Sequence, residues 1–314
     1  QSENSDLAVR QQLPKDTLRV QIIEFSEYHL DAAVNLFQSI YGAERRQSPD
    51  LPTIALGDQD HLRMEIAGLT ETGGVAAFEG DRLVGYLFSG YSFTFKGQNT
   101  SMVPEVGHAV APSSDARAAV YTQMIARVGE MWTARRSNIH ILGYLAHDRT
   151  LETEIFRFGY GQILAERLRD LSSLAEVADF DIEPLADVEV LVELEAEHCR
   201  YYGGSPIFVN KPHADPDGIL RDLRKEQARG SIYLVHKRED KPVGYFVVGP
   251  ASEDGEGLLL RGTNSAQIRG AFVKPSWRGK GIGRALLEAA VHWSETEGFD
   301  RLLVEHESAN VPGR

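Results

Sequence analysis

Apolar residues follow two spacings along the chain, and each spacing predicts a type of element. Residues 18–25, 74–79 and 83–93 are apolar runs that predict strands, whereas Leu30 to Ile40 repeats apolar residues at helical spacing. Carried through, the pattern predicts further helices at 59–69, 114–136, 149–158, 186–202, 215–229 and 280–297, and further strands at 105–111, 139–146, 162–171 (a pair), 181–184, 231–237, 242–249, 268–273 and 302–306. Strands and helices in this order predict an α/β protein with helices on both faces of its sheets.

The same order of elements occurs twice. Val84-Gly-Tyr-Leu matches Val243-Gly-Tyr-Phe, and Val110-Ala-Pro-Ser matches Val273-Lys-Pro-Ser, at nearly equal offsets of 159 and 163 residues. A long predicted helix follows each Val-x-Pro-Ser segment. The sequence therefore predicts a disordered tail at 1–16, a first domain at 17–172, a linker at 173–180 and a second domain at 181–314.

Composition narrows the classes of function. The 314 residues suit two domains of about 150 residues each. A net charge of −13 argues against a nucleic-acid partner and mildly favours a cationic substrate such as an amine. No apolar run approaches the ~20 residues of a membrane span, so we expect no membrane partner. The single cysteine, Cys199, permits no intrachain disulfide and suits the cytoplasm; it reads as a small buried residue. The histidines lack metal-ligand spacing, so no metal is expected.

The most specific motif is a glycine-rich turn between a strand and a helix. The strand that ends at Val273 is followed by Pro275 and then by Arg-Gly-Lys-Gly-Ile-Gly-Arg over 278–284. Free N–H groups at the start of a helix attract an anion such as pyrophosphate, and glycine lets a ligand approach the backbone closely. The Walker pattern is excluded because Gly281 follows Lys280, and the dinucleotide pattern because Arg284 stands where it needs Gly or Ala.

Set after Val-x-Pro, this Arg-Gly-x-Gly-Ile-Gly-x-x-Leu-Leu segment resembles the acetyl-CoA loop of the GNAT superfamily of N-acyltransferases. The resemblance implies two tandem GNAT-like domains, each a mixed central sheet flanked by helices, with acetyl-CoA as co-substrate. It implies that backbone groups of Phe272 and Val273 bind pantetheine and that the turn binds pyrophosphate. The implied cofactor-binding residues are Phe272, Val273, Arg278, Gly279, Lys280, Gly281, Ile282, Gly283, Arg284 and Asn310.

The first copy departs from this motif. An offset of 163 residues places Asp115 opposite Arg278, and Ala116, Ala118 and Val120 opposite the three glycines. Side chains would block the approach of a pyrophosphate, and a carboxylate would repel it. The chain thus resembles tandem GNAT proteins in which an altered N-terminal copy supports an active C-terminal copy. Whether the altered copy binds another ligand or a partner stays open.

The catalytic residues are less defined. The glutamate that often serves the family as general base is replaced by Gln267, so the base is expected to be Glu305 or His306 on the next strand. Asn310 either contacts the cofactor or caps a helix. The tyrosines at 201 and 202 line the acceptor pocket or belong to the core. Trp277 either stacks on adenine or covers the helix.

The sequence therefore predicts an N-acetyltransferase that moves an acetyl group to a small-molecule or peptide amine by direct attack in a ternary complex. The alternative is a non-catalytic acyl-CoA sensor or protein-interaction module, which the glutamine at 267 favours. A homo-oligomer stays open. By analogy with the first copy, the helix and strands expected after Asn310 are missing, which suggests a truncated chain with an exposed sheet edge.

Overall fold

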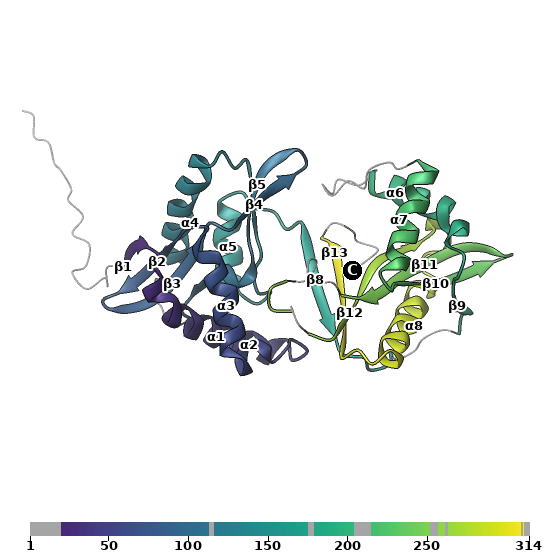
Figure 1. Ribbon diagram of the computed structural model, residues 1–314, viewed down its shortest axis with the longest axis horizontal. Helices are drawn as coiled ribbons and strands as arrows, with labels where there is room; N and C mark the ends of the chain where they lie inside the picture. Colours follow the sequence, from purple (N-terminus) through teal and green to yellow (C-terminus); the bar gives the residue numbers. More distant parts are fainter. Residues whose placement is uncertain are drawn as a thin grey trace, which may run out of the picture. The chain divides into compact units, whose positions relative to one another are not determined.

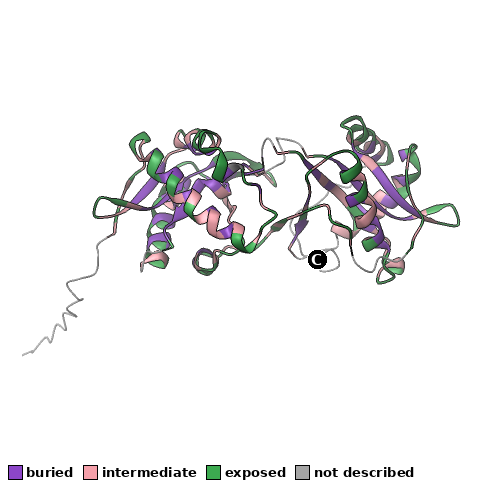
Figure 2. Ribbon diagram, turned by 90° about the horizontal axis from the view of Figure 1, so that it is seen from below, coloured by how far each residue is buried: buried purple, intermediate pink, exposed green. Residues whose placement is uncertain are grey.

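The computed structural model describes residues 20–112, 116–174, 179–203, 215–251, 257–260, 263–308 and 310. The chain divides into two compact units (Figure 1): Gln1–Tyr41 with Asp58–Glu154, and Gly42–Gly57 with Ile155–Arg314. The expected tail at 1–16 and Asp115 lie outside the described residues. In both units the inner strands are largely buried, whereas several outer strands and the outer faces of the helices are exposed (Figure 2).

The first unit holds two sheets where we expected one mixed sheet. β1 (Val20–Glu24), β2 (Gly74–Glu79), β3 (Arg82–Phe88) and β6 (His108–Val110) form an antiparallel sheet in the order β1-β2-β3-β6. β4 (Tyr91–Phe95), β5 (Gln98–Val103) and β7 (Ile139–Leu142) form the other. The predicted strand at 83–93 was wrong because the backbone turns at Gly90, whose φ is +76°. The helices up to this point of the chain are α1 (Leu30–Gln47), α2 (Ile54–Gly57), α3 (Gln59–Thr70), α4 (Arg117–Ala134) and α5 (Arg149–Arg157). The end of α1, all of α2 and the end of α5 are grouped with the second unit.

The second unit holds a mixed sheet in the order β8-β13-β12-β11-β10-β9. The strands are β8 (Leu164–Arg169), β9 (Ile182–Pro184), β10 (Ile232–Arg238), β11 (Lys241–Pro250), β12 (Ser265–Val273) and β13 (Arg301–Glu307). One face packs against α6 (Val192–Gly203) and α7 (Pro216–Ala228), and the other against α8 (Ile282–Thr296). Asp215 starts α7 by accepting a hydrogen bond from the Gly218 N–H, with Pro216 at the first helical position.

β8 is placed differently from our prediction. We expected 162–171 to form a strand pair that closes the first copy, but β8 is a single strand that runs antiparallel to β13, from Leu302 opposite Arg169 to Glu307 opposite Leu164. The edge of β13 that we expected to be exposed is therefore covered by β8 (Figure 1).

β12 and β13 separate partway along their length. Their parallel pairing runs from Ser265 opposite Arg301 to Ile268 opposite Val304 and stops there, although β12 continues to Val273 and β13 to Glu307. A bulge at Arg269 accompanies the separation, because Val247 pairs with Gly270 and Val248 with Ile268. The extra residue keeps Phe272 on the α6 side of the sheet, where strict alternation from Ile268 would place it on the α8 side.

The repeated Val-Gly-Tyr segments have the same register in the two units. Gly85 pairs with Val110 as Gly244 pairs with Val273, and the Ala111 N–H donates to Val84 O as the Lys274 N–H donates to Val243 O. Both glycines lie under a helix: a Cβ on Gly85 would come within 3.1 Å of Val120 in α4, and one on Gly244 within 3.3 Å of Ile282 in α8. The repeat in the sequence thus corresponds to a repeated hairpin, strand and helix.

Candidate active site

The glycine-rich turn leads directly into α8. After β12, a single helical turn at Pro275–Trp277 precedes Gly279 and Gly281, whose φ values of +73° and +91° are left-handed. Glycine adopts this backbone without the penalty that a Cβ brings. Gly281 is the N-cap of α8 and supplies no side-chain cap, and residues 279–281 are exposed. The first turn of α8 therefore offers backbone N–H groups to a ligand from solvent.

Besides Arg278, three cations lie at this turn or next to its Trp277, and they differ in their contacts. The Lys280 ammonium lies 4.2 Å from the centre of the Trp277 ring, and the Arg238 guanidinium lies 5.8 Å from it. Trp277 is thus a partly buried core residue between two cations. Arg284 is exposed on the first turn of α8. The positive charge at a helix N-terminus suits an anionic ligand.

Arg278 connects the turn to the end of β12. Its Nε donates to the Val273 carbonyl at 2.9 Å, and its guanidinium lies 4.4 Å from the centre of the Tyr201 ring. The side chain therefore spans from the strand to α6. Tyr201 in turn donates to Asn310 Oδ1 at 3.4 Å, so that α6, the turn and the segment after β13 meet at one place.

The backbone of β12 offers a free edge where it leaves β13. Since the Lys274 N–H donates to β11, antiparallel alternation directs the backbone groups of Phe272 toward β11 as well. The groups of Ala271 and Val273 then face the separated side. This edge and the cradle of positive-φ glycines fit an extended amide such as pantetheine followed by a pyrophosphate. Of the two predicted pantetheine-binding residues, Val273 presents its backbone to the opening, while Phe272 lines the core and stacks on His198 at 4.8 Å.

A buried polar cluster supports α6 beneath the opening. His198 Nδ1 lies 2.8 Å from Tyr245 Oη and 3.2 Å from Glu195 Oε2, and Tyr245 also donates to that carboxylate. Burial first, and the Glu195 charge second, raise the pKa of Tyr245. Its hydroxyl therefore stays protonated as a donor. Next to this cluster, Tyr202 donates to Glu307 Oε2 at 2.8 Å, which ties α6 to the end of β13.

The two predicted base candidates point to opposite faces of the sheet. Leu302 and Val304 pack with α8, so His306 faces that side, whereas Glu305 shares the α6 face with Glu307. Partial desolvation, with the Glu307 charge second, raises the pKa of Glu305 although its side chain stays accessible to solvent. His306 Nε2 accepts from Arg167 Nε at 2.9 Å, and its Nδ1 lies 3.1 Å from the Glu307 carbonyl oxygen. Because an arginine N–H only donates, the His306 lone pair is already used.

Gln267 lies on β12 below the point of separation, opposite Leu303 of β13. Its buried Oε1 has no hydrogen-bond partner within the described part of the chain. An amide at this position cannot take up a proton as a glutamate could.

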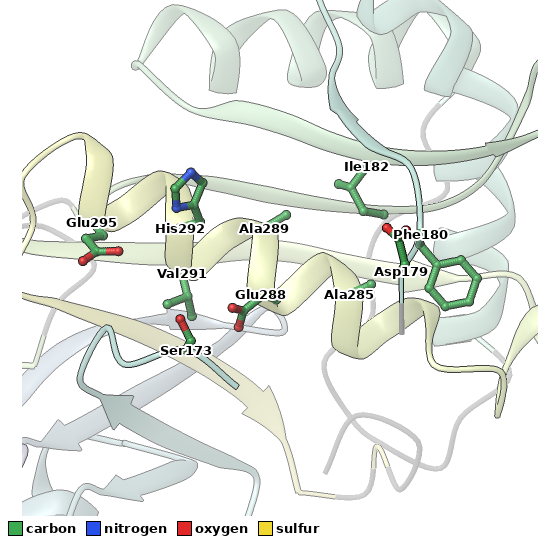
Figure 3. A pocket seen from close by; sticks show the side chains of 10 residues that line it. All are labelled: Ser173, Asp179, Phe180, Ile182, Ala285, Glu288, Ala289, Val291, His292 and Glu295. Atoms are coloured by element: carbon green, nitrogen blue, oxygen red, sulfur yellow. The ribbon is translucent and has the colours of Figure 1, made fainter. Parts of the chain in front are cut away.

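A cavity of ≈ 510 Å³ lies along α8 (Figure 3). Its walls are Glu288, His292 and Glu295 on one side, and Phe180 with Ile182, the first residue of β9, on the other. None of the predicted cofactor-binding residues lines it. Among the described residues, no cluster of three His, Cys, Asp or Glu side chains could hold a metal ion, and no helix there is long and apolar enough to cross a bilayer.

Sequence reasoning missed how the tyrosines and Arg278 act together. It named the residues at 201 and 202 only as pocket or core, and it gave Arg278 a role toward pyrophosphate alone. The contacts from Tyr201 to Arg278 and from Tyr202 to Glu307 join segments about 80 and 105 residues apart, and no local pattern carries them.

The second unit is similar in sequence to known acetyltransferases. Residues 192–314 match the model of the acetyltransferase (GNAT) family. The aminoglycoside N(6′)-acetyltransferase type 1 of Stenotrophomonas maltophilia is 30% identical over 93 residues, which are 28% of this chain. The chain spans 58% of that relative's length. Residues 192–314 are therefore similar to acetyltransferases of the GNAT type.

Two solved structures extend the similarity in fold over most of the chain. A GCN5-related N-acetyltransferase from Sphaerobacter thermophilus has a TM-score of 0.53 at 13% identity, covering 94% of this chain and 89% of that one. A GCN5-related glucosamine N-acetyltransferase region of a fungal multi-domain GH3 β-N-acetylglucosaminidase has a TM-score of 0.50 at 12% identity, covering 91% of this chain and 35% of that one. At these identities the similarity concerns the fold.

Proposed function

We propose that the chain is an acetyl-CoA-dependent N-acetyltransferase that binds its co-substrate in the second unit and acts on an amine by direct attack in a ternary complex. The observation that carries the proposal is the separation of β12 from β13 next to an uncapped helix N-terminus with two positive-φ glycines. Bound acetyl-CoA would supply the acetyl thioester. An open strand edge and an anion-binding turn suit the two chemically different ends of such a molecule.

The residues of the turn would bind the pyrophosphate. The N–H groups around Gly281 and Gly283 face solvent at the start of α8, and Lys280 and Arg284 add positive charge. The Val273 N–H would bind the pantetheine arm, and Asn310 would contact the co-substrate from the other side of the opening. Arg278 would hold the end of β12 through the Val273 carbonyl.

We assign the general base to Glu305 and not to His306. Glu305 lies on the α6 face at the end of the opening, and its raised pKa makes it a stronger base than an ordinary glutamate. Tyr202 holds the neighbouring Glu307 in place at 2.8 Å. His306 faces α8 and already accepts a hydrogen bond from Arg167.

The acceptor class that fits this opening is a cationic amine. Glu305 and Glu307 present carboxyl groups on one face, and the chain carries a net charge of −13. The matched S. maltophilia relative bears the name of an enzyme that acetylates aminoglycosides. Amines with several ammonium groups are therefore the first acceptors to test.

We further propose that the first unit is an altered GNAT-like copy. The shared register of the Val-Gly-Tyr segments and the matching packing of α4 and α8 support a common origin. A four-stranded sheet with β6 separate from β7 resembles the separated strands of the second unit.

Isothermal titration calorimetry with acetyl-CoA tests the proposal directly. We expect one site per chain, followed by release of free CoA thiol when a polyamine or an aminoglycoside is added. Binding without thiol release from any amine would favour the acyl-CoA sensor. Absence of binding would refute the co-substrate site.

A further inference from the structure

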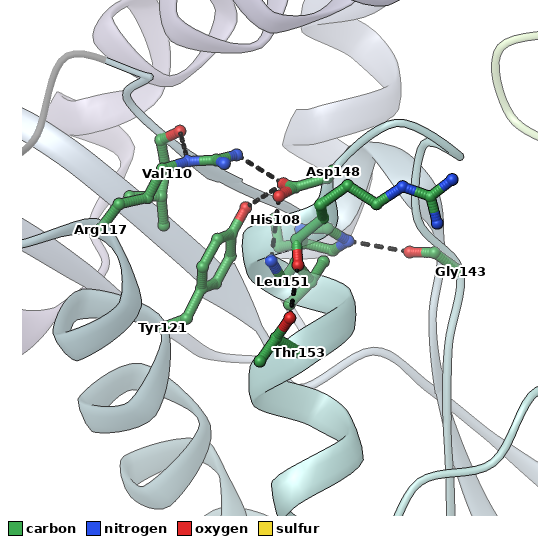
Figure 4. Close-up of polar contacts among 9 residues, drawn as sticks. His108, Val110, Arg117, Tyr121, Gly143, Asp148, Leu151 and Thr153 are labelled. Carbon is green, nitrogen blue, oxygen red and sulfur yellow. Dashed lines mark hydrogen bonds and ion pairs between the residues drawn. The ribbon is translucent and has the colours of Figure 1, made fainter.

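The first unit contains a buried polar network at the N-terminus of α4 (Figure 4). The Asp148 carboxylate accepts from Arg117 Nη2 at 2.6 Å and from the Tyr121 hydroxyl at 2.7 Å. Its second oxygen accepts from the Leu151 N–H at 3.0 Å and caps α5. The Asp148 and Arg117 side chains are 8% and 18% exposed, so the ion pair is largely shielded from solvent.

The arginine in this network corresponds in space to Arg278 of the second unit. Arg117 Nε donates to the Val110 carbonyl at 3.3 Å, as Arg278 Nε donates to the Val273 carbonyl at 2.9 Å. Val110 and Val273 occupy the same position in the shared strand register. The 163-residue offset had placed Asp115 opposite Arg278, so the sequence alignment missed this equivalence.

The two arginines differ in their remaining contact. Nη2 of Arg117 binds Asp148, a residue that follows β7 as Asn310 follows β13. The Nη groups of Arg278 have no carboxylate partner within the described part of the chain. An anionic ligand would bind to the guanidinium there. Helix α4, like α8, begins without a side-chain cap.

A second feature of the same place is a histidine with an unsatisfied nitrogen. His108 is 6% exposed, and its Nε2 lies 2.8 Å from the Gly143 carbonyl, so Nε2 carries the proton. Its Nδ1 is buried without a hydrogen-bond partner among the described residues, and His108 lines a cavity of ≈ 10 Å³ with Tyr121 and Asp148. That volume holds about one water molecule. His108 thus links β6 to the residue that follows β7, next to a space of about one water molecule.

We propose that the first unit retains an anion-binding site for a phosphate group at the N-terminus of α4, and that the chain's own Asp148 carboxylate occupies it. Arg117 and Tyr121 bind the carboxylate as they would bind a phosphate oxygen. The equivalence with Arg278 rests on the proposed function, whereas the network itself does not. The first unit then takes no CoA because its anion site is already filled.

The experiment replaces Asp148 and supplies inorganic pyrophosphate. The Asp148→Asn variant removes the charge but retains an oxygen that can cap α5. Glu152→Gln removes an exposed carboxylate of α5, bound to Arg149, and is the matched control for net charge. Asp148→Asn with Arg117→Gln removes both partners. Thermal unfolding is recorded with and without pyrophosphate, after CoA has been added to fill the second unit.

We expect pyrophosphate at ten times its Kd to raise the Tm of Asp148→Asn by about 3–6 °C, and to leave the Tm of wild type, Glu152→Gln and the double variant unchanged. If Asp148→Asn is unfolded without the anion, pyrophosphate should refold it but not the double variant.

No response of Asp148→Asn, or an equal response of Glu152→Gln, overturns the proposal. A failure of CoA to bind the second unit is seen separately by calorimetry. It leaves the comparison between the variants intact.

Discussion

Gly281 provides the sharpest test of the turn, because a side chain there should affect two separate quantities. These are the stability of the fold, through the backbone conformation, and the affinity for acetyl-CoA, through the approach of the ligand. Its φ of +91° lies in the left-handed region, where an L-residue costs about 1–2 kcal/mol. Gly281→Ala should lower the free energy of unfolding by that amount, which is a factor of about 5–30 in the folding equilibrium. At about 2–4 °C per kcal/mol, the Tm should fall by roughly 2–8 °C.

The same substitution should weaken acetyl-CoA binding by more than it weakens folding. Relief of the strain would turn the N–H groups of α8 away from the ligand, and the new methyl group would occupy the approach of the pyrophosphate. We expect the Kd to rise at least tenfold, about 1.4 kcal/mol, by calorimetry at a temperature where both proteins are folded.

Two matched variants separate the contributions. Asn tolerates a positive φ better than Ala, so Gly281→Asn should retain more stability while its side chain still blocks the ligand. Gly283 has an ordinary helical φ, and a Cβ there would meet no atom within 4 Å, so Gly283→Ala should leave the Tm unchanged or slightly higher. The reasoning is refuted if Gly281→Ala is as stable as wild type and binds acetyl-CoA equally well.

Three further predictions concern other parts of the molecule. Glu305→Gln should lower kcat/KM for the amine by about 10²–10⁴-fold and remove the acid limb of the pH–rate profile. In wild type, the midpoint of that limb should lie above 4.5, the pKa of an ordinary glutamate. An unchanged limb in the variant would exclude Glu305 as the base. Burial lowers the pKa of His108, so below about pH 6.5 the unfolded chain takes up a proton that the folded one does not; stability should fall with falling pH, less steeply in His108→Gln, as denaturant titrations can show. Leu286→Ala, at a fully buried position of α8, should cost about 2–5 kcal/mol of stability in the same titrations, and a smaller loss would mean that α8 packs differently.

The sequence predicted those parts of the second unit whose signals lie close together along the chain. The strand predicted at 268–273 and the helix predicted at 280–297 were confirmed as β12 and α8, since each signal lies within a few residues of the next. The predicted helix at 59–69 was confirmed as α3, which Asp58 caps through the His61 N–H.

The remainder depended on contacts that no local pattern encodes. The bulge at Arg269 reverses the alternation along β12 and decides which face Phe272 joins. The strand pairing of β8 with β13 joins residues about 133 to 143 positions apart, and the hydrophobic pattern of 164–169 does not specify a partner. The link from Arg117 to Asp148 likewise joins two separate elements of the first unit.

The pairing of β8 with β13 determines where a fragment that contains only the second unit can begin. The linker expected at 173–180 suggests that a shortened version of the second unit could start there. Such a fragment would lack β8, and the row of backbone groups from Leu302 to Glu307 would be left as an open edge beside the proposed base. A fragment intended for expression on its own therefore has to start upstream of Leu164, so that it includes β8 together with the sheet to which β8 belongs.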